Sequence, residues 1–302
     1  MSGRSIPDDH AHLSAAAQKL LVADEQTRIA AIRTDFWVAY PVAKKALADM
    51  RDLLDEPRNP RTRNLLLVGR SGNGKSSIVR RFVKENSRRI REDGQADFPV
   101  VAVDMPPDAS ETRFWSQVLR SLRVPFAESA SPQRKMSQAF SVLEAVNCRA
   151  IIVDDVHNAN VSNPRQVKQF LNVLKQSSTE LQIPIIAVGI EDALNMLRSD
   201  RQLFSRFEQL LLPRWSLDKD WLSLLSAFEM SLPLANRSDL GSRTFAPLLL
   251  SKSNATIGGL AWILRKAAVA SIRDGSERIT PQAIERLGGQ TAEDFSRAAA
   301  EL

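Results

Sequence analysis

The chain has 302 residues, of which 43% are hydrophobic and 25% are charged, and this balance excludes a wholly disordered protein. Its 41 basic and 35 acidic residues give a formal net charge of +6, which fits either binding to a polyanion or an ordinary basic surface. A single cysteine, Cys148, excludes an intrachain disulfide, and no apolar run approaches the ~20 residues of a membrane span, so we expect a cytoplasmic protein without membrane association.

The first 60 residues are expected to form a helical extension. After a polar arm that ends near residue 12, the pattern up to residue 54 is mostly helical, with a break near Pro41. Apolar residues recur at helical spacing after this proline, at Val42, Ala43, Ala46, Leu47, Met50 and Leu54. Residues 55–63, DEPRNPRTR, contain two prolines and three arginines, and we interpret them as a linker or turn.

Residues 61–213 show short apolar runs that alternate with helical segments. The five apolar runs are residues 65–68, 99–103, 150–153, 183–188 and 210–212. Helical segments follow the first run, begin near Ser110, and continue at residues 132–146, at 164–174 and from about 191. Because this alternation is typical of a parallel sheet covered on both faces, we predict an α/β fold with a five-stranded parallel sheet.

Residues 214–290 lack a strand pattern and are predicted to form a small all-helical domain. Helical segments fit residues 218–230, 244–250, 257–272 and 281–287. Thr280 followed by Pro281 is typical of a helix start, with an N-cap residue before a proline in the first turn. Residues 291–302 are expected to be a loosely held tail.

A glycine-rich motif follows the first apolar run. Residues 69–76, GRSGNGKS, match the phosphate-binding pattern G-x-x-x-x-G-K-[ST] in full. Glycines allow left-handed backbone angles, and main-chain N–H groups at a helix start form a nest for anions. Lys75 is expected to reach the β- and γ-phosphates of ATP, and the Ser76 hydroxyl to bind Mg²⁺. The candidate nucleotide-binding residues are Gly69, Gly72, Asn73, Gly74, Lys75, Ser76 and Ser77.

The third apolar run ends in two carboxylates. Residues 150–155 read AIIVDD, which is the arrangement of a Walker B site. Asp154 is expected to hold Mg²⁺, directly or through water, and Asp155 to orient the attacking water. Glutamate is commoner than aspartate at the second position, and aspartate is one methylene shorter, so hydrolysis is expected to be slow. The alternative is a strand that ends in an acidic turn.

Arg206 precedes the fifth apolar run, within the segment RQLFSRF. An arginine finger at this position would project from one subunit toward the nucleotide of the next and stabilise charge on the transferred phosphate. Arg201 is the reserve candidate, and the alternative is a surface or ion-paired arginine. Gly189 and Ile190, at the end of the fourth run, offer no polar side chain that could orient water.

Five stretches, in this order, resemble the AAA+ ATPases, and within them the TniB/TnsC group of transposition regulators. They are residues 34–40 (TDFWVAY), 64–77 around the glycine-rich loop, Met105-Pro106, 153–157 (VDDVH) and 205–213 (SRFEQLLLP). The resemblance covers residues 25–290 and implies an AAA+ domain followed by a small helical lid.

The resemblance also implies the function of a regulator that activates or targets a DDE transposase. Proteins of this group bind double-stranded DNA with ATP and assemble into rings or filaments of identical subunits. The implied partners are the transposase and a TniQ-like targeting protein, and the loop of residues 106–113 is a candidate for lining a DNA-binding pore. Two alternatives remain open: a replication-type AAA+ helicase loader, and an ATP-gated DNA-binding scaffold with little hydrolysis.

Overall fold

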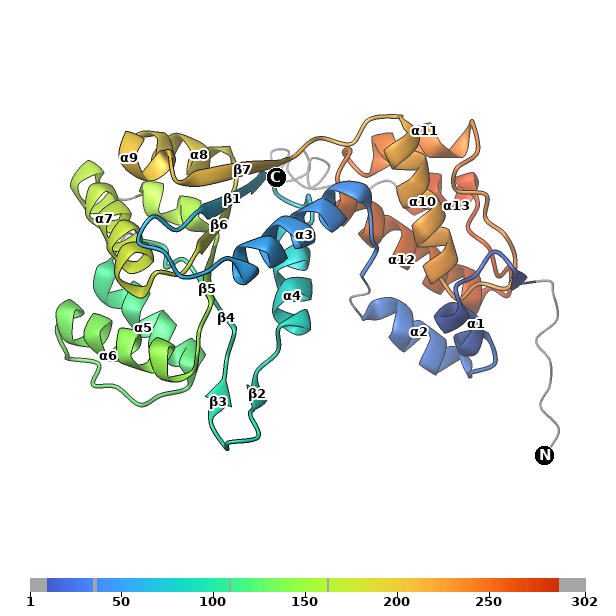
Figure 1. Cartoon of the computed structure of the whole chain (residues 1–302). Helices are drawn as coiled ribbons and strands as arrows, with labels where there is room; N and C mark the ends of the chain where they lie inside the picture. Colours follow the sequence, from blue (N-terminus) through green and yellow to red (C-terminus); the bar gives the residue numbers. More distant parts are fainter. Residues whose placement is uncertain (1–9, 35–36, 109, 162, 288–302) are drawn as a thin grey trace. The chain divides into compact units, whose positions relative to one another are not determined.

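The computed structural model describes residues 10–34, 37–108, 110–161 and 163–287. The chain divides into two compact units. One comprises the residues up to Pro41 together with those from Arg214 onward, and the other runs from Val42 to Pro213. The sheet belongs to the second unit, whereas the first is helical (Figure 1).

The α/β unit is built on a five-stranded sheet with the order β4-β5-β6-β1-β7. Its strands are β1 (Asn64–Gly69), β4 (Val100–Asp104), β5 (Ala150–Asp154), β6 (Ile185–Gly189) and β7 (Phe207–Leu212). Every neighbouring pair in this sheet is parallel, which confirms the predicted fold class. Since β1 lies between β6 and β7, the residues that follow β1 emerge near the ends of both neighbouring strands.

Helices pack around the sheet at the places where the sequence predicts helical segments (Figure 1). They are α3 (Pro41–Asp55), α4 (Lys75–Glu85), α5 (Glu111–Leu122), α6 (Pro132–Ala145), α7 (Pro164–Leu181), α8 (Glu191–Arg198) and α9 (Arg201–Phe204). Ser110, Ser131 and Asn163 cap α5, α6 and α7, each through a side-chain oxygen that accepts a main-chain N–H of the first turn. Phe114 of α5 packs edge to face on Phe170 of α7, within the core beside the sheet.

A short antiparallel hairpin, which the pattern of apolar runs does not predict, lies between α4 and β4. β2 (Arg89–Ile90) pairs with β3 (Ala96–Asp97), and Gly94 has a φ of +79° in the turn. The Arg89 guanidinium donates to the buried Asp97 carboxylate at 2.6 Å, which links the two strands. Strands of two residues are too short to leave an alternating pattern, although the Asp-Gly pair at residues 93–94 is a usual hairpin signal.

The helical unit combines helices from both ends of the described chain. They are α1 (Ala15–Leu21), α2 (Glu25–Arg33), α10 (Lys219–Ser231), α11 (Phe245–Lys252), α12 (Ile257–Arg273) and α13 (Pro281–Leu287). α2 packs against α12. The Arg28 guanidinium of α2 binds both carboxylate oxygens of Glu277 and donates to the Pro233 carbonyl oxygen at 2.7 Å. The Arg28 side chain is largely buried, and a buried charged group is stable only when it is paired. These contacts therefore hold α2 against the segments that follow α10 and α12.

This grouping differs from the domain boundaries expected from the sequence. Residues 1–60 were expected as one extension, whereas α1 and α2 belong with the C-terminal helices and α3 belongs almost wholly to the α/β unit. Contacts between distant parts of the chain decide this grouping, and a local pattern does not contain them. The expected tail of residues 291–302 lies outside the described residues. Among the helices that the structure describes, none alone is long and apolar enough to cross a membrane, and only α11 and α12 taken as a pair, bent by 113°, meet that criterion.

Candidate nucleotide-binding site

The glycine-rich loop lies at the carboxyl end of β1 and leads directly into α4. β1 ends at Gly69, and α4 begins at Lys75. Gly72 and Gly74 have φ angles of +72° and +86°, in the region where a side chain would be strained. Gly74 is the N-cap of α4 and offers no side chain to bond the first main-chain N–H groups of the helix. These N–H groups can therefore serve an anion at the positive end of the helix dipole.

Gly69 and Asn73 hold the loop against the end of β7. A Cβ at Gly69 would lie 2.9 Å from the Leu212 Cβ, which is closer than side chains approach one another. The Asn73 side chain is 3% exposed, and its Nδ2 donates to the carbonyl oxygens of Leu212 at 3.1 Å and Pro213 at 2.8 Å. The side chain of Asn73, a predicted nucleotide-binding residue, thus faces β7 and fixes the shape of the loop.

The Lys75 ammonium is buried beneath the loop. Lys75 is 6% exposed, and its Nζ donates to the carbonyl oxygens of Gly69 at 2.8 Å and Arg70 at 3.0 Å. Burial lowers the pKa of Lys75, whereas the nearby carboxylates of Asp154 and Asp155 act in the opposite direction. A phosphate at this position would favour the charged ammonium and restore its pKa.

The Asp154 carboxylate lies beside the Ser76 hydroxyl, at the end of β5. Asp154 is 7% exposed and accepts hydrogen bonds from the Ser76 hydroxyl and, at 2.9 Å, from the Asp155 main-chain N–H. Burial raises the pKa of Asp154, and the carboxylates of Asp155 and Asp104 raise it further. Asp104 is the register partner of Asp154 on β4. The end of the sheet therefore carries an excess of negative charge that a divalent cation would relieve.

These residues fit an ATP–Mg²⁺ complex. Mg²⁺ is usually held by one or two protein oxygens together with phosphate oxygens and water, and the adjacent Ser76 and Asp154 provide two such oxygens. Lys75 and the N–H groups that open α4 would hold the β- and γ-phosphates. Ser77, another predicted binding residue, lies one position further along α4, where its hydroxyl accepts from Arg80 at 3.2 Å. Bound Mg²⁺ would neutralise charge on the phosphates.

Asp155 and His157 follow directly after β5. Asp155 has a φ of +50°, its side chain is 52% exposed, and its Oδ1 lies 4.0 Å from the His157 Nδ1. A Cβ at Gly189 would lie 3.3 Å from that same His157 nitrogen and 2.7 Å from the Cβ of Ala193. Close packing therefore admits no side chain at the end of β6, whereas the nearby carboxylate of Asp155 is open to solvent.

Arg206 lies at the opposite edge of the sheet. It immediately precedes β7, and its carbonyl oxygen accepts from the Asn64 N–H at the start of β1, at 2.8 Å. The whole of β1, about 16 Å at the usual rise of a parallel strand, separates this edge from Gly69. The Arg206 guanidinium donates to the Thr179 hydroxyl at 3.1 Å. The structure thus brings the loop, Ser76 and Asp154 together in one subunit and keeps Arg206 apart from them.

The family model described as Bacterial TniB protein matches residues 28–217 of the chain. The chain belongs to the TniB family. The match contains the glycine-rich loop, Asp154 and Arg206, so all three features of this TniB protein lie in the family's shared region. A search of curated proteins found no significant match.

Three solved structures have a fold similar to that of this TniB chain. Cdc6p from Pyrobaculum aerophilum has a TM-score of 0.58 and 19% identity, over 82% of this chain and 67% of that one. The ORC1 protein of Aeropyrum pernix, solved in complex with DNA, has a TM-score of 0.54 and 15% identity, over 85% and 68% of the two chains. A Walker-type ATPase of Pyrococcus abyssi has a TM-score of 0.53 and 13% identity, over 90% and 78%. These similarities, with the sheet and the C-terminal helices, confirm the predicted AAA+ fold.

Two residues near these sites were not singled out from the sequence. Asp104 is the last residue of β4. Because parallel strands end at a common edge of the sheet, the sequence pattern was sufficient to predict its position beside Asp154. Arg61 lies in the segment interpreted as a linker, and no local signal places it near Arg206. Their proximity depends on the pairing of β1 with β7.

Proposed function

We propose that this chain is an ATP-dependent, DNA-binding AAA+ protein that activates or targets a DDE transposase. The observation that carries the proposal is the separation of two complementary sites, within a TniB family chain. The phosphate-binding loop and Asp154 lie at the carboxyl edge of the sheet, and Arg206 lies at the amino edge. Such halves complete one another when identical subunits stack head to tail, as a ring or a filament requires.

In this arrangement ATP and Mg²⁺ lie between subunits. Lys75 and the loop glycines hold the phosphates of their own subunit's nucleotide, and Ser76 and Asp154 hold the Mg²⁺. Asp155 orients the attacking water in the same subunit. Arg206 of the next subunit supplies positive charge to the transferred phosphate, so ATP links one subunit to another and hydrolysis loosens that link.

DNA binding is supported by the net charge of +6 and by the fold that the chain shares with the Aeropyrum pernix ORC1 protein, whose structure contains DNA. Binding through phosphate contacts releases counterions and has little sequence preference. We therefore expect the ATP-bound assembly to bind double-stranded DNA without a fixed recognition sequence, and a transposase or a TniQ-like protein to supply the remaining specificity.

The rate of hydrolysis separates this proposal from the scaffold alternative. Asp155 is open to solvent and can orient water, but its carboxylate is one methylene shorter than the usual glutamate. Steady-state ATP turnover with and without double-stranded DNA is the measurement. We expect slow turnover that DNA stimulates, whereas turnover that is absent with and without DNA would favour the ATP-gated scaffold.

The partner separates the transposition regulator from a helicase loader. The test is a pull-down with the ATP-bound protein on DNA, against the purified transposase, a TniQ-like protein and the replicative helicase. Retention of the transposase in the presence of ATP, and its loss with the Lys75→Ala variant, is the expected result. Retention of the helicase alone would favour the loader.

A further inference from the structure

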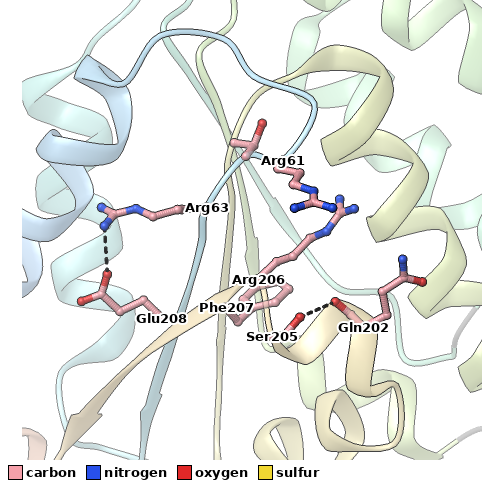
Figure 2. A pocket seen from close by; sticks show the side chains of 8 residues that line it. Arg61, Arg63, Gln202, Ser205, Arg206, Phe207 and Glu208 are labelled. Carbon is pink, nitrogen blue, oxygen red and sulfur yellow. Dashed lines mark hydrogen bonds and ion pairs between the residues drawn. The ribbon is translucent and has the colours of Figure 1, made fainter.

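A cavity of about 590 Å³ opens at the amino edge of the sheet, on the side away from the phosphate-binding loop. The segment before β1 and the end of α9 with the start of β7 form its walls (Figure 2). Its lining residues are Arg61, Thr62, Arg63, Gln202, Ser205, Arg206, Phe207 and Glu208. Three arginines against one glutamate give this cavity a positive charge.

The side chains of Arg61 and Arg206 extend toward one another in this cavity (Figure 2). Arg206 is half-buried, and its guanidinium has the neutral Thr179 hydroxyl as its hydrogen-bond partner. Within the residues that the structure describes, the Arg61 side chain forms no hydrogen bond or ion pair, and only its main-chain N–H is bonded, to the Asn59 side chain. Two guanidinium groups that converge without a carboxylate repel one another.

Arg63 differs from this pair, although it lies only two residues from Arg61. Its guanidinium binds the Glu56 carboxylate at 2.8 Å and lies 3.9 Å from that of Glu208. Figure 2 shows it on the opposite side of β1 from the other two arginines. The chain therefore neutralises one of the three arginines and leaves a convergent pair, which is the arrangement expected of a site that an anion completes.

We propose that Arg61 and Arg206 together form one anion site, which takes the terminal phosphates of a nucleotide held by a second copy of this chain. This inference rests on the proposed trans arrangement and adds to it a second arginine, from a different part of the chain. The two groups would share the charge that develops on the phosphate as its bond to ADP breaks.

The chemistry of the pair favours a nucleotide over DNA. A terminal phosphate carries close to two negative charges, which match two guanidinium groups, whereas a DNA phosphodiester carries one. Successive DNA phosphates also favour cations spread along a groove over two that converge. The chain's own nucleotide is excluded as the ligand because the length of β1 separates the pair from the loop.

The test is ATP turnover by the full chain at saturating DNA and Mg²⁺, with Arg61→Ala, Arg61→Lys and the control Arg63→Ala. We expect Arg61→Ala to lower kcat by ~10²-fold, Arg61→Lys to recover part of that loss, and Arg63→Ala to stay within about twofold of the parent. ATP affinity of unassembled subunits should be unchanged in all three, since the phosphates there are held by Lys75. Arg61 is exposed, so its removal should leave the fold intact.

Mixing the Arg61→Ala and Lys75→Ala variants identifies the subunit in which Arg61 acts. An Arg61→Ala subunit keeps an intact phosphate-binding loop, and a Lys75→Ala subunit keeps both Arg61 and Arg206. An interface in which the loop of the first variant faces the arginines of the second therefore contains a complete site. Partial recovery of turnover in the mixture is expected. Assembly with a non-hydrolysable ATP analogue gives a second readout, in which Arg61→Ala should require about tenfold more protein to assemble.

Three outcomes would count against the proposal in distinguishable ways. If Arg206→Ala retains full turnover and assembly, the trans arrangement itself is wrong. If Arg206→Ala is impaired but Arg61→Ala is not, only the second arginine is wrong. A third result is that Arg61→Ala weakens DNA binding, with turnover and assembly unchanged. If the slope of the logarithm of the DNA-binding constant against the logarithm of the salt concentration also falls in magnitude by about one, the cavity binds a DNA phosphate.

Discussion

The side-chain amide of Asn73 donates a hydrogen bond of 3.1 Å to the carbonyl oxygen of Leu212, and thereby joins the phosphate-binding loop to the last residue of β7. β7 begins immediately after Arg206. One rigid strand therefore connects the loop at one edge of the sheet with the arginine at the other. A shift of the loop on nucleotide binding would reach Arg206 along this strand.

This relationship gives a prediction for Asn73→Ala. The substitution leaves the carbonyl oxygens of Leu212 and Pro213 without their donor, and the loop loses its attachment to β7. We expect a loss of ~1–3 kcal/mol in unfolding free energy, together with weaker ATP binding. Thermal unfolding and titration with a fluorescent ATP analogue measure the two effects. Gln138→Ala removes an exposed amide–carbonyl bond to Pro125 and is the matched control, for which a change within ~0.5 kcal/mol is expected. Equal behaviour of the two variants would contradict the structural role of Asn73.

The second prediction concerns Lys75→Ala. Removing the buried ammonium eliminates the charge expected to hold the β- and γ-phosphates, so ATP binding should weaken strongly. Lys84→Ala, at an exposed position of the same helix, removes the same charge away from the loop and should bind ATP like the parent. Equilibrium titration of both variants with ATP is the measurement. If Lys75→Ala binds ATP as tightly as the parent, the loop does not bind the phosphates of ATP.

The third prediction concerns Asp155 and Arg206. Arg206→Ala should keep ATP binding in isolated subunits but lose turnover, by up to ~10³-fold where the parent rate allows such a range to be measured. Asp155→Asn should bind ATP, assemble on DNA and hydrolyse very little. Mixing the two inactive variants creates interfaces that pair an intact Asp155 with an intact Arg206, so partial turnover should return. Co-assembly without any recovery would indicate that Arg206 is structural.

The fourth prediction concerns the pH dependence of stability through Cys148. Burial raises the pKa of this thiol from 9.0 to about 12. Its contribution to stability is complete below the unfolded-state pKa and is lost as pH rises toward 12, because the unfolded chain releases the proton first. Urea unfolding of the parent should thus lose more stability between pH 9 and 11 than that of Cys148→Ala. Burial also raises the pKa of Tyr40 to about 12, so a smaller loss of stability with rising pH is expected in both proteins. Identical changes of unfolding free energy with pH in the parent and in Cys148→Ala would contradict a raised pKa for the Cys148 thiol.

The elements of the α/β unit were largely predictable, because each buried strand is a continuous apolar run. β7 shows where this signal weakens. The apolar run begins at Leu210, but the strand begins at Phe207, and Glu208 and Gln209 are exposed between them. Within the part of the chain that the structure describes, β7 is an edge strand that pairs only with β1, so polar side chains are tolerated there.

The site was predictable to the extent that its chemistry is local in sequence. The loop, Lys75, Ser76 and Asp154 follow from motifs whose spacing the backbone enforces. The contact of Asn73 with Leu212 and the convergence of Arg61 with Arg206 join residues more than a hundred positions apart. Such contacts depend on the order of strands in the sheet, and no periodicity in the sequence encodes that order.

The most direct test of the central claim is DNA binding by the parent protein, measured with ATP, with a non-hydrolysable analogue and without nucleotide, over a range of salt concentrations. We predict tight binding to unrelated duplexes with ATP or the analogue, little binding without nucleotide, and an affinity that falls steeply as salt rises. Binding that is indifferent to nucleotide, or an affinity that stays constant across salt, would contradict an ATP-dependent protein that binds DNA through its phosphates.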